Sequence, residues 1–347
     1  MIHREKLLQS FMNRESKHRD IYHDMMPFKV KEILLVANLY DAFFIEREGR
    51  FSEIMLYDYG NMNLSSFPRI TGVSTKDEVF EQLEEKNIDM VIVMVGLNTM
   101  RPLSISKKIK EYFPDMPVFV LLNNNQNVSF FQRYHGKNVF DQLFVWNGES
   151  RIFFAMIKYL EDLKNAKNDT KIASVRQILI VEDSPTYYSS FLTHLYRIIY
   201  KQTNEIINDV STDNLYKVLK LRARPKILLA SNYEEAMELF HEYKDFIFLL
   251  ITDVQYFKEG AMDKDAGFKL IETINKEKPQ IPTIMLSQDK TKGPIAKEKG
   301  ITFIDKNAQH LYKDLNHTVT PKIGFGVFIF TDRKEKELDV AKRSREF

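Results

Sequence analysis

The sequence predicts an α/β protein made of two flavodoxin-like, doubly wound (βα)5 domains with parallel sheets. The chain has 347 residues, which is too long for one ordinary core and favours two domains. Short apolar runs alternate with helical stretches, and this pattern occurs twice, as an internal repeat of about 140 to 150 residues. Apolar runs without polar alternation are typical of parallel strands that helices cover on both faces.

Bulk composition excludes several classes of protein. Hydrophobic residues make up 44% and charged residues 28% of the chain, as in ordinary globular proteins. A formal net charge of +2 provides no large field that would attract nucleic acid or an anionic membrane. There is no cysteine for disulfides or thiolate metal sites, and no apolar run approaches the roughly 18 residues of a membrane span. The charged start, MIHREKLLQSF, does not resemble a signal peptide. We therefore expect a cytoplasmic protein without nucleic-acid or membrane partners.

The first half of the chain consists of an extension and one predicted domain. Residues 1–28 are charged and have the weak apolar spacing of an amphipathic helix, which predicts an N-terminal helical extension. The domain predicted at 29–165 has strands at EILLVAN, DMVIVMV, PVFVLL and QLFVW, and closes with the helical stretch RIFFAMIKYLEDL. The polar segment 161–176 has no sustained apolar period, so we predict the interdomain linker there.

The second half repeats this layout between residues 175 and 320. Its predicted strands are QILIV, KILLAS, FIFLLIT, PTIML and ITFID, with helices between them. After this domain, residues 321–347 contain the run GFGVFIF and a charged, helix-like segment. This tail does not close a domain, and we predict that it is an extension toward a further domain.

Polar side chains follow four of the predicted strands in the second domain. Glu182 and Asp183 follow the first strand, Asp253 the third, Ser287 the fourth and Lys306 the fifth. Because the carboxyl ends of parallel strands meet at one edge of a sheet, these side chains should lie together. Carboxylates, a hydroxyl and an ammonium suit a small hard cation with a phosphoryl group. A cation would also explain two adjacent carboxylates at the end of a buried strand, where like charges raise each other's pKa.

Each of these residues also has a purely structural interpretation. The acidic pair could serve a helix start, with Ser184 as N-cap and Pro185 at the first helical position. Asp253 could be a turn residue, the serine a loop hydroxyl and the lysine a surface charge. Their occurrence at four expected strand ends favours a common site.

On these residues, the second domain resembles a response-regulator receiver domain of two-component signalling. The resemblance implies a phosphoacceptor at Asp253, which takes its phosphoryl group from a phosphohistidine of a sensor histidine kinase or phosphotransfer protein. It also implies Mg²⁺ as cofactor. It implies that Glu182, Asp183 and Asp253 are the metal ligands and that Ser287 and Lys306 contact the phosphoryl group. It also implies that Phe303 is the switch aromatic.

The chain departs from the pattern of that family at several points. The first crossover is extended by KQTNEIINDVSTDNLYKVLKLRARPK, and the loop VQYFKEGAMDKDAG after Asp253 is long. Asn307 follows the lysine where the family usually has proline, and the stretch KTKGP interrupts the helix expected there. We therefore expect the usual output face to be remodelled.

The first domain resembles a degenerate receiver, because the charged residues of the site are replaced. Aligning EILLVANLYDAF with QILIVEDSPTYY places neutral residues at each charged position. The replacements are Ala37 and Asn38 for the acidic pair, Met94 for the phosphoacceptor, Leu122 for the hydroxyl, and Trp146 or Asn147 for the lysine. The role of this half is then structural or interactive, and RIFFAMIKYLEDL is either a contact helix or a cover for its own sheet.

Tandem receivers with long first crossovers resemble the N-terminal regulatory regions of phosphoenolpyruvate synthase-like or pyruvate phosphate dikinase-like proteins. The leading hypothesis is a phosphorylation-dependent signalling module that regulates an output domain in cis or in trans and is not itself an enzyme beyond its own phosphorylation. The alternative is a non-phosphorylated, receiver-like protein-interaction module that holds a structural cation. The sequence lacks the Asp-x-Asp pair of a phosphohydrolase, a Gly-rich dinucleotide fingerprint and a helix-turn-helix, which disfavours those classes.

Overall fold

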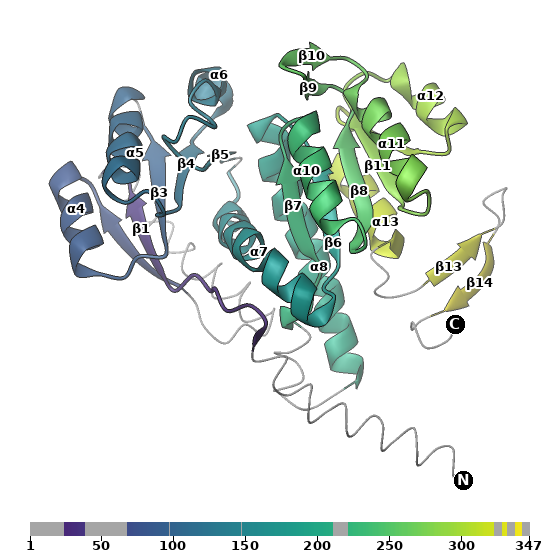
Figure 1. Cartoon of the computed structure of the whole chain (residues 1–347), viewed down its shortest axis with the longest axis horizontal. Helices are drawn as coiled ribbons and strands as arrows, with labels where there is room; N and C mark the ends of the chain where they lie inside the picture. Colours follow the sequence, from purple (N-terminus) through teal and green to yellow (C-terminus); the bar gives the residue numbers. More distant parts are fainter. Residues whose placement is uncertain are drawn as a thin grey trace, which may run out of the picture. The chain divides into compact units, whose positions relative to one another are not determined.

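A computed structural model describes residues 24–38, 68–96, 98–146, 148–210, 221–322, 328–331 and 337–341 (Figure 1). Packing divides this part of the chain into two compact units. The first unit contains Lys29–Lys158 and Ser184–Tyr196, and the second contains Tyr159–Asp183 and the chain from Arg197 onward, with the described residues before Lys29. Most of the extension predicted at 1–28 lies outside the described residues.

Five parallel strands form the sheet of the first unit, in the order β2-β1-β3-β4-β5. The strands are β1 (Glu32–Val36), β2 (Arg69–Val73), β3 (Met90–Val95), β4 (Val118–Leu122) and β5 (Gln142–Val145). The connecting helices are α4 (Lys76–Glu85), α5 (Met100–Tyr112) and α6 (Val128–Gln132), with the 3-10 turn η1 (Asn125–Asn127). Four strands coincide with the predicted apolar runs. The fifth, β2, is absent from that prediction because its residues RITGV are half-exposed and include a glycine.

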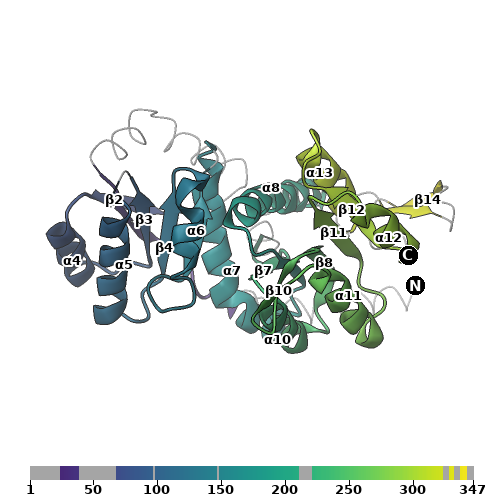
Figure 2. The same cartoon turned by 90° about the horizontal axis from the view of Figure 1, so that it is seen from above.

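The sheet of the second unit also has five parallel strands, in the order β12-β11-β8-β6-β7. They are β6 (Gln177–Val181), β7 (Lys226–Ala230), β8 (Ile247–Asp253), β11 (Thr283–Ser287) and β12 (Thr302–Asp305). Its helices are α10 (Tyr233–Tyr243), α11 (Ala266–Glu277), α12 (Lys292–Glu298) and α13 (Leu311–Lys322), together with the part of α8 (Pro185–Val210) from Arg197 onward. Figure 2 shows α10 and α11 on one face of the sheet and α8 and α13 on the other. The predicted fold class, two flavodoxin-like parallel sheets with interleaved helices, is confirmed.

Local capping chemistry fixes where two of the helices begin. At the start of α4, Thr75 Oγ1 accepts a hydrogen bond from the Glu78 amide at 3.3 Å, and the Glu78 carboxylate accepts one from the Thr75 amide at 3.0 Å. At the start of α10, Asn232 Oδ1 accepts a hydrogen bond from the Glu235 amide at 2.9 Å. These side chains satisfy amides that have no partner inside the helix, so each strand-to-helix turn is specified locally.

The segment predicted as a linker is helical, because α7 extends without a break from Arg151 to Ala173. Several polar residues of its second half are buried on one face of the helix, among them Asp162, Asn165 and Asp169. Asn165 Oδ1 accepts a hydrogen bond from the Phe28 amide at 2.9 Å, and its side-chain amide donates to the Phe28 carbonyl at 2.7 Å. This buried face therefore binds backbone and charged groups instead of apolar side chains, which is why it lacks the apolar period expected of a helix.

Two acidic residues on that face of α7 neutralise cations from the start of β7. Asp162 receives two hydrogen bonds from the guanidinium of Arg224, at 2.7 Å and 3.0 Å, and both side chains have no solvent exposure. Asp169 pairs with the ammonium of Lys226 at 3.0 Å. Burial and the neighbouring guanidinium lower the pKa of Lys226, while the two carboxylates oppose that change. Buried charges of this kind persist only when they are paired, so the second half of α7 is part of the second unit's core.

In the first unit, the beginning of α8 covers the outer edge of β5. The hydroxyl of Tyr188 donates to the Leu143 carbonyl, and Ser189 Oγ accepts a hydrogen bond from the Val145 amide at 3.0 Å. Both backbone groups belong to an edge strand and would otherwise lack a partner in the sheet. The helix stretch RIFFAMIKYLEDL contributes buried side chains, including Phe153 and Met156.

The predicted C-terminal extension contains a short antiparallel pair of strands, β13 (Phe328–Thr331) and β14 (Glu337–Ala341). The helix-like character expected of the charged segment is therefore wrong for Glu337–Ala341, which form a strand paired with the apolar run before it. Within the residues described, no helix combines the length and the apolar character that crossing a membrane would need.

Candidate functional site

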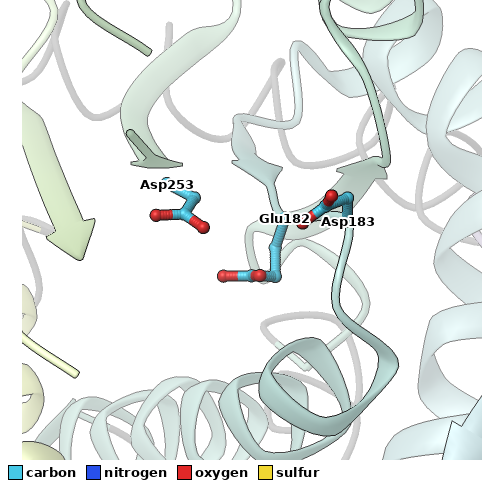
Figure 3. A group of neighbouring side chains, drawn as sticks. All are labelled: Glu182, Asp183 and Asp253. Atoms are coloured by element: carbon cyan, nitrogen blue, oxygen red, sulfur yellow. The ribbon is translucent and has the colours of Figure 1, made fainter. Parts of the chain in front are cut away.

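Three carboxylates meet at the carboxyl edge of the second sheet. Glu182 and Asp183 follow β6, and Asp253 ends β8, the strand that pairs with β6. One oxygen from each carboxylate lies within 4.8 Å of the others. Figure 3 shows the three side chains around a common space, each reaching it from the end of its strand. Glu182 is only 1% exposed, whereas the two aspartates are half-buried.

Lys306 joins two of these carboxylates. Its ammonium lies 2.6 Å from Glu182 Oε2 and 2.7 Å from Asp253 Oδ2, and its side chain is buried. The lysine follows β12, and its amide donates to the Ser287 carbonyl at 2.8 Å. The sequence led us to expect this ammonium to act on a phosphoryl group, whereas here it already binds carboxylates. Lys306 therefore organises the acidic site as well.

Ser287 lies at the end of β11, between the strands that carry Asp253 and Lys306. It is buried, and its Oγ accepts a hydrogen bond from the Asp289 amide at 3.0 Å. A hydroxyl that accepts one hydrogen bond can still donate its own hydrogen. The five polar residues predicted from the strand ends therefore share one edge of the sheet.

Burial and mutual repulsion shape the protonation of the site. Burial, opposed by Lys306 and aided by Asp253, raises the pKa of Glu182 to about 8. Burial and the charge of Asp253 raise the pKa of Asp183 to about 6. Burial disfavours the charge of Lys306, but Glu182 and Asp253 together raise its pKa above the ordinary value. One ammonium thus faces three carboxylates, and these hard oxygen donors suit Mg²⁺.

The predicted switch aromatic, Phe303, lies on β12 and is half-buried against the core. It packs under α12 at Gly293, where an added Cβ would lie 3.3 Å from the ring. The stretch KTKGP is compatible with this short helix, which begins at Lys292. The ring therefore contacts the helix that lies between β11 and β12.

The long loop predicted after Asp253 is an ordered hairpin, formed by β9 (Tyr256–Lys258) and β10 (Ala261–Asp263). Buried Tyr256 anchors it, with its hydroxyl 3.2 Å from Thr252 Oγ1, which in turn donates to the Asp253 carbonyl at 2.8 Å. Its turn lies at Glu259 and Gly260, whose φ angles are 53° and 77°, and the glutamate gives no sequence signal for such a turn. Positive φ at both central residues is typical of a tight hairpin turn.

Gly267, in the first turn of α11, holds the backbone next to Asp253. Its amide donates to the Val254 carbonyl at 2.9 Å, and an added Cβ would lie 2.1 Å from the Asp253 carbonyl oxygen. No motif in the sequence distinguishes this glycine from the others.

We expect Gly267→Ala to lower the free energy of unfolding by about 1–3 kcal/mol, because backbone must move to admit the methyl group. Chemical denaturation measures the loss. Gly72→Ala is the matched control, since an added Cβ there meets nothing within 4 Å. Equal stability of the two variants would contradict the close approach at Asp253.

The corresponding edge of the first sheet is neutral. Ala37, Met94 and Leu122 are buried apolar side chains at three positions of the aligned site, and Asn147 lies outside the described residues. A cavity of about 80 Å³ lies at this edge, with Asn38 and Arg101 in its lining. Among the residues that the structure describes, the group of three potential metal ligands occurs in the second unit alone.

No family model matches the sequence, and no curated protein matches it. Among solved structures, the chain is similar to a response regulator receiver domain protein from Clostridium thermocellum, with 20% identity and a TM-score of 0.29 over 43% of this chain and 94% of that one. It is also similar to a protein assigned as a two-component system response regulator/GGDEF domain protein, with 15% identity and a TM-score of 0.32 over 84% of this chain and 98% of that one.

Proposed function

We propose that the protein is a phosphorylation-dependent signalling module of a two-component phosphorelay, which accepts a phosphoryl group on Asp253. The observation that carries this proposal is the placement of Asp253 beside Glu182, Asp183 and Lys306 at one sheet edge. An aspartate nucleophile must approach a phosphoryl group that is itself negative, so both charges need nearby cations. Lys306 supplies one positive charge, and a cation bound by the three carboxylates would supply a second.

Each residue of the site has a definite part in this chemistry. A carboxylate oxygen of Asp253 forms a bond to phosphorus, while the bond between phosphorus and the donor's imidazole nitrogen breaks and the imidazole leaves with the bonding electrons. Glu182, Asp183 and Asp253 hold Mg²⁺, which supplies charge neutralisation when bound. Lys306 and the hydroxyl of Ser287 donate hydrogen bonds to the transferred oxygens.

The remaining roles belong to the same proposal. The donor is a sensor histidine kinase or a phosphotransfer protein, and the output domain acts in cis or in trans. Phe303 responds to the phosphoryl group, and the module catalyses no reaction beyond its own phosphorylation and dephosphorylation. In this proposal the protein is cytoplasmic, and its first half is a degenerate receiver that is not phosphorylated.

The test is treatment of the whole chain with acetyl phosphate and Mg²⁺, followed by intact mass measurement and peptide mapping. We expect a gain of one phosphoryl group on Asp253, and no gain in Asp253→Asn or in chelator. Asp314→Asn, which removes an exposed carboxylate from α13, is the matched control and should behave like the parent.

Two outcomes would contradict the proposal. Modification that persists in Asp253→Asn, or that maps to the first unit, would show that the phosphoacceptor is wrong. Mg²⁺ binding without any phosphoryl gain would favour the alternative, an interaction module with a structural cation.

A further inference from the structure

A cleft of about 600 Å³ lies at the amino-terminal ends of β6, β8 and β11, the end of the second sheet away from the acidic site. Its walls come from the residues before these strands, from the first two residues of β8 and from the last residues of α13. A cleft of this volume accommodates a small organic ligand. None of its lining residues belongs to the phosphorylation chemistry described above.

The lining of the cleft is strongly cationic. It contains Arg176, Lys244, Lys278 and Lys322, and a single acidic residue, Asp245. Lys278 is paired with Asp245 at 2.6 Å, and Lys244 is paired at 3.6 Å with a glutamate outside the lining. Two of the four cations therefore already have a counterion.

The other two cations, Arg176 and Lys322, have no carboxylate within 4 Å among the residues that the structure describes. The ammonium of Lys322 is half-buried, and this burial lowers its pKa. A cation that is partly removed from water without a protein counterion is well placed to bind an anion. The cleft thus offers two positive groups to a ligand.

Aromatic rings form part of the same cleft. Phe246 and Phe248 lie in its lining and are half-buried, so part of each ring remains accessible. The guanidinium carbon of Arg176 lies 5.9 Å from the centroid of Phe248. Planar heterocycles stack on aromatic rings and on guanidinium planes, while guanidinium and ammonium groups bind phosphate oxygens.

We propose that this cleft is a binding site for a nucleotide, a planar base that carries a phosphate group. The phosphate binds between Arg176 and Lys322, and the base lies against the rings of Phe246 and Phe248. The site needs no metal, and it is independent of Asp253 and of the phosphorylation proposed for it.

The experiment is calorimetric titration of the whole chain with AMP and GMP in the presence of chelator, which excludes metal-mediated binding at the acidic edge. Ribose 5-phosphate, which lacks the base, and adenosine, which lacks the phosphate, are titrated in parallel. We expect at least one nucleotide to bind at least tenfold more tightly than either fragment.

Variants assign the binding to the cleft. Lys322→Met and Arg176→Gln should each weaken nucleotide binding at least fivefold, and a melting curve of each confirms that it folds. Asp253→Asn should leave the affinity unchanged, as should Lys313→Met, which removes an exposed cation of α13 outside the lining. Affinity unaltered in both cleft variants, no binding of either nucleotide, or equal binding of ribose 5-phosphate would overturn the proposal.

Discussion

Replacing Asp162 by alanine is expected to lower the free energy of unfolding by about 3–5 kcal/mol, because it leaves a buried guanidinium without its counterion. The two carboxylate oxygens of Asp162 receive both hydrogen bonds from Arg224, and one of them also accepts from the Ile227 amide at 3.0 Å. Arg224 Nε donates to the Tyr200 hydroxyl at 2.8 Å, so the guanidinium cannot move to solvent without losing a further bond. Urea denaturation of the whole chain measures the effect.

The matched control is an ion pair on the surface of the same helix. Lys167 pairs with Glu242 at 3.2 Å, but the lysine side chain is 84% exposed. Lys167→Met should therefore change the free energy of unfolding by less than about 1 kcal/mol. The double variant Asp162→Leu with Arg224→Leu should lose less stability than Asp162→Ala, since it removes both charges together. If Asp162→Ala and Lys167→Met have equal effects, the buried pair does not stabilise the second unit.

In chelator, the melting temperature of the protein should fall as the pH rises from about 5 to about 9. Glu182 and Asp183 have raised pKa values in the folded protein, about 8 and about 6, against ordinary values of 4.5 and 3.8. Between the ordinary and the raised value, the folded state binds more protons than the unfolded state, so stability decreases with rising pH. The loss should be on the order of a few kcal/mol and should be complete once both carboxyls are ionised.

Asp183→Asn separates this charge effect from other causes. It removes one carboxylate and keeps the shape of the side chain, so in chelator near pH 8 it should melt above the parent. Mg²⁺ should stabilise the parent, by about 2.7 kcal/mol at a concentration one hundred times its dissociation constant, and should barely stabilise the variant. A parent that melts at the same temperature with Mg²⁺ and with chelator, or a variant less stable than the parent in chelator, would mean that no metal site exists.

The strands at the centre of each sheet could be predicted because burial on both faces makes their sequences unbroken apolar runs. QILIV and FIFLLIT are examples, and the polar residues that end such runs mark the edge where the site lies. Strand β2 could not be found in this way, because an exposed edge strand has no such run. The meeting of these side chains at one sheet edge was therefore predictable. The contacts of Lys306 with two carboxylates were not, because the order of strand ends indicates which residues lie close together but not which of them form ion pairs.

Two elements needed information that a local pattern does not contain. The polar face of α7 has the composition of a linker. The cations that pair with it, Arg224 and Lys226, lie far along the sequence, at the start of β7. The hairpin β9–β10 turns at Glu259 and Gly260, and glutamate is not among the residues that usually indicate such a turn. In both cases, contacts between distant segments override the local propensity.

The division of the chain into two units also determines which fragments of the protein contain a complete unit. The first unit takes residues from both sides of β6, namely Lys29–Lys158 and Ser184–Tyr196. A break at the start of β6 would remove the counterions Asp162 and Asp169 from one fragment and would deprive the other of the helix that covers β5. Each sheet has the topology of an independent domain, yet no single cut in this region yields two intact folding units. A fragment that is meant to contain all residues of either unit must therefore include chain from both sides of β6.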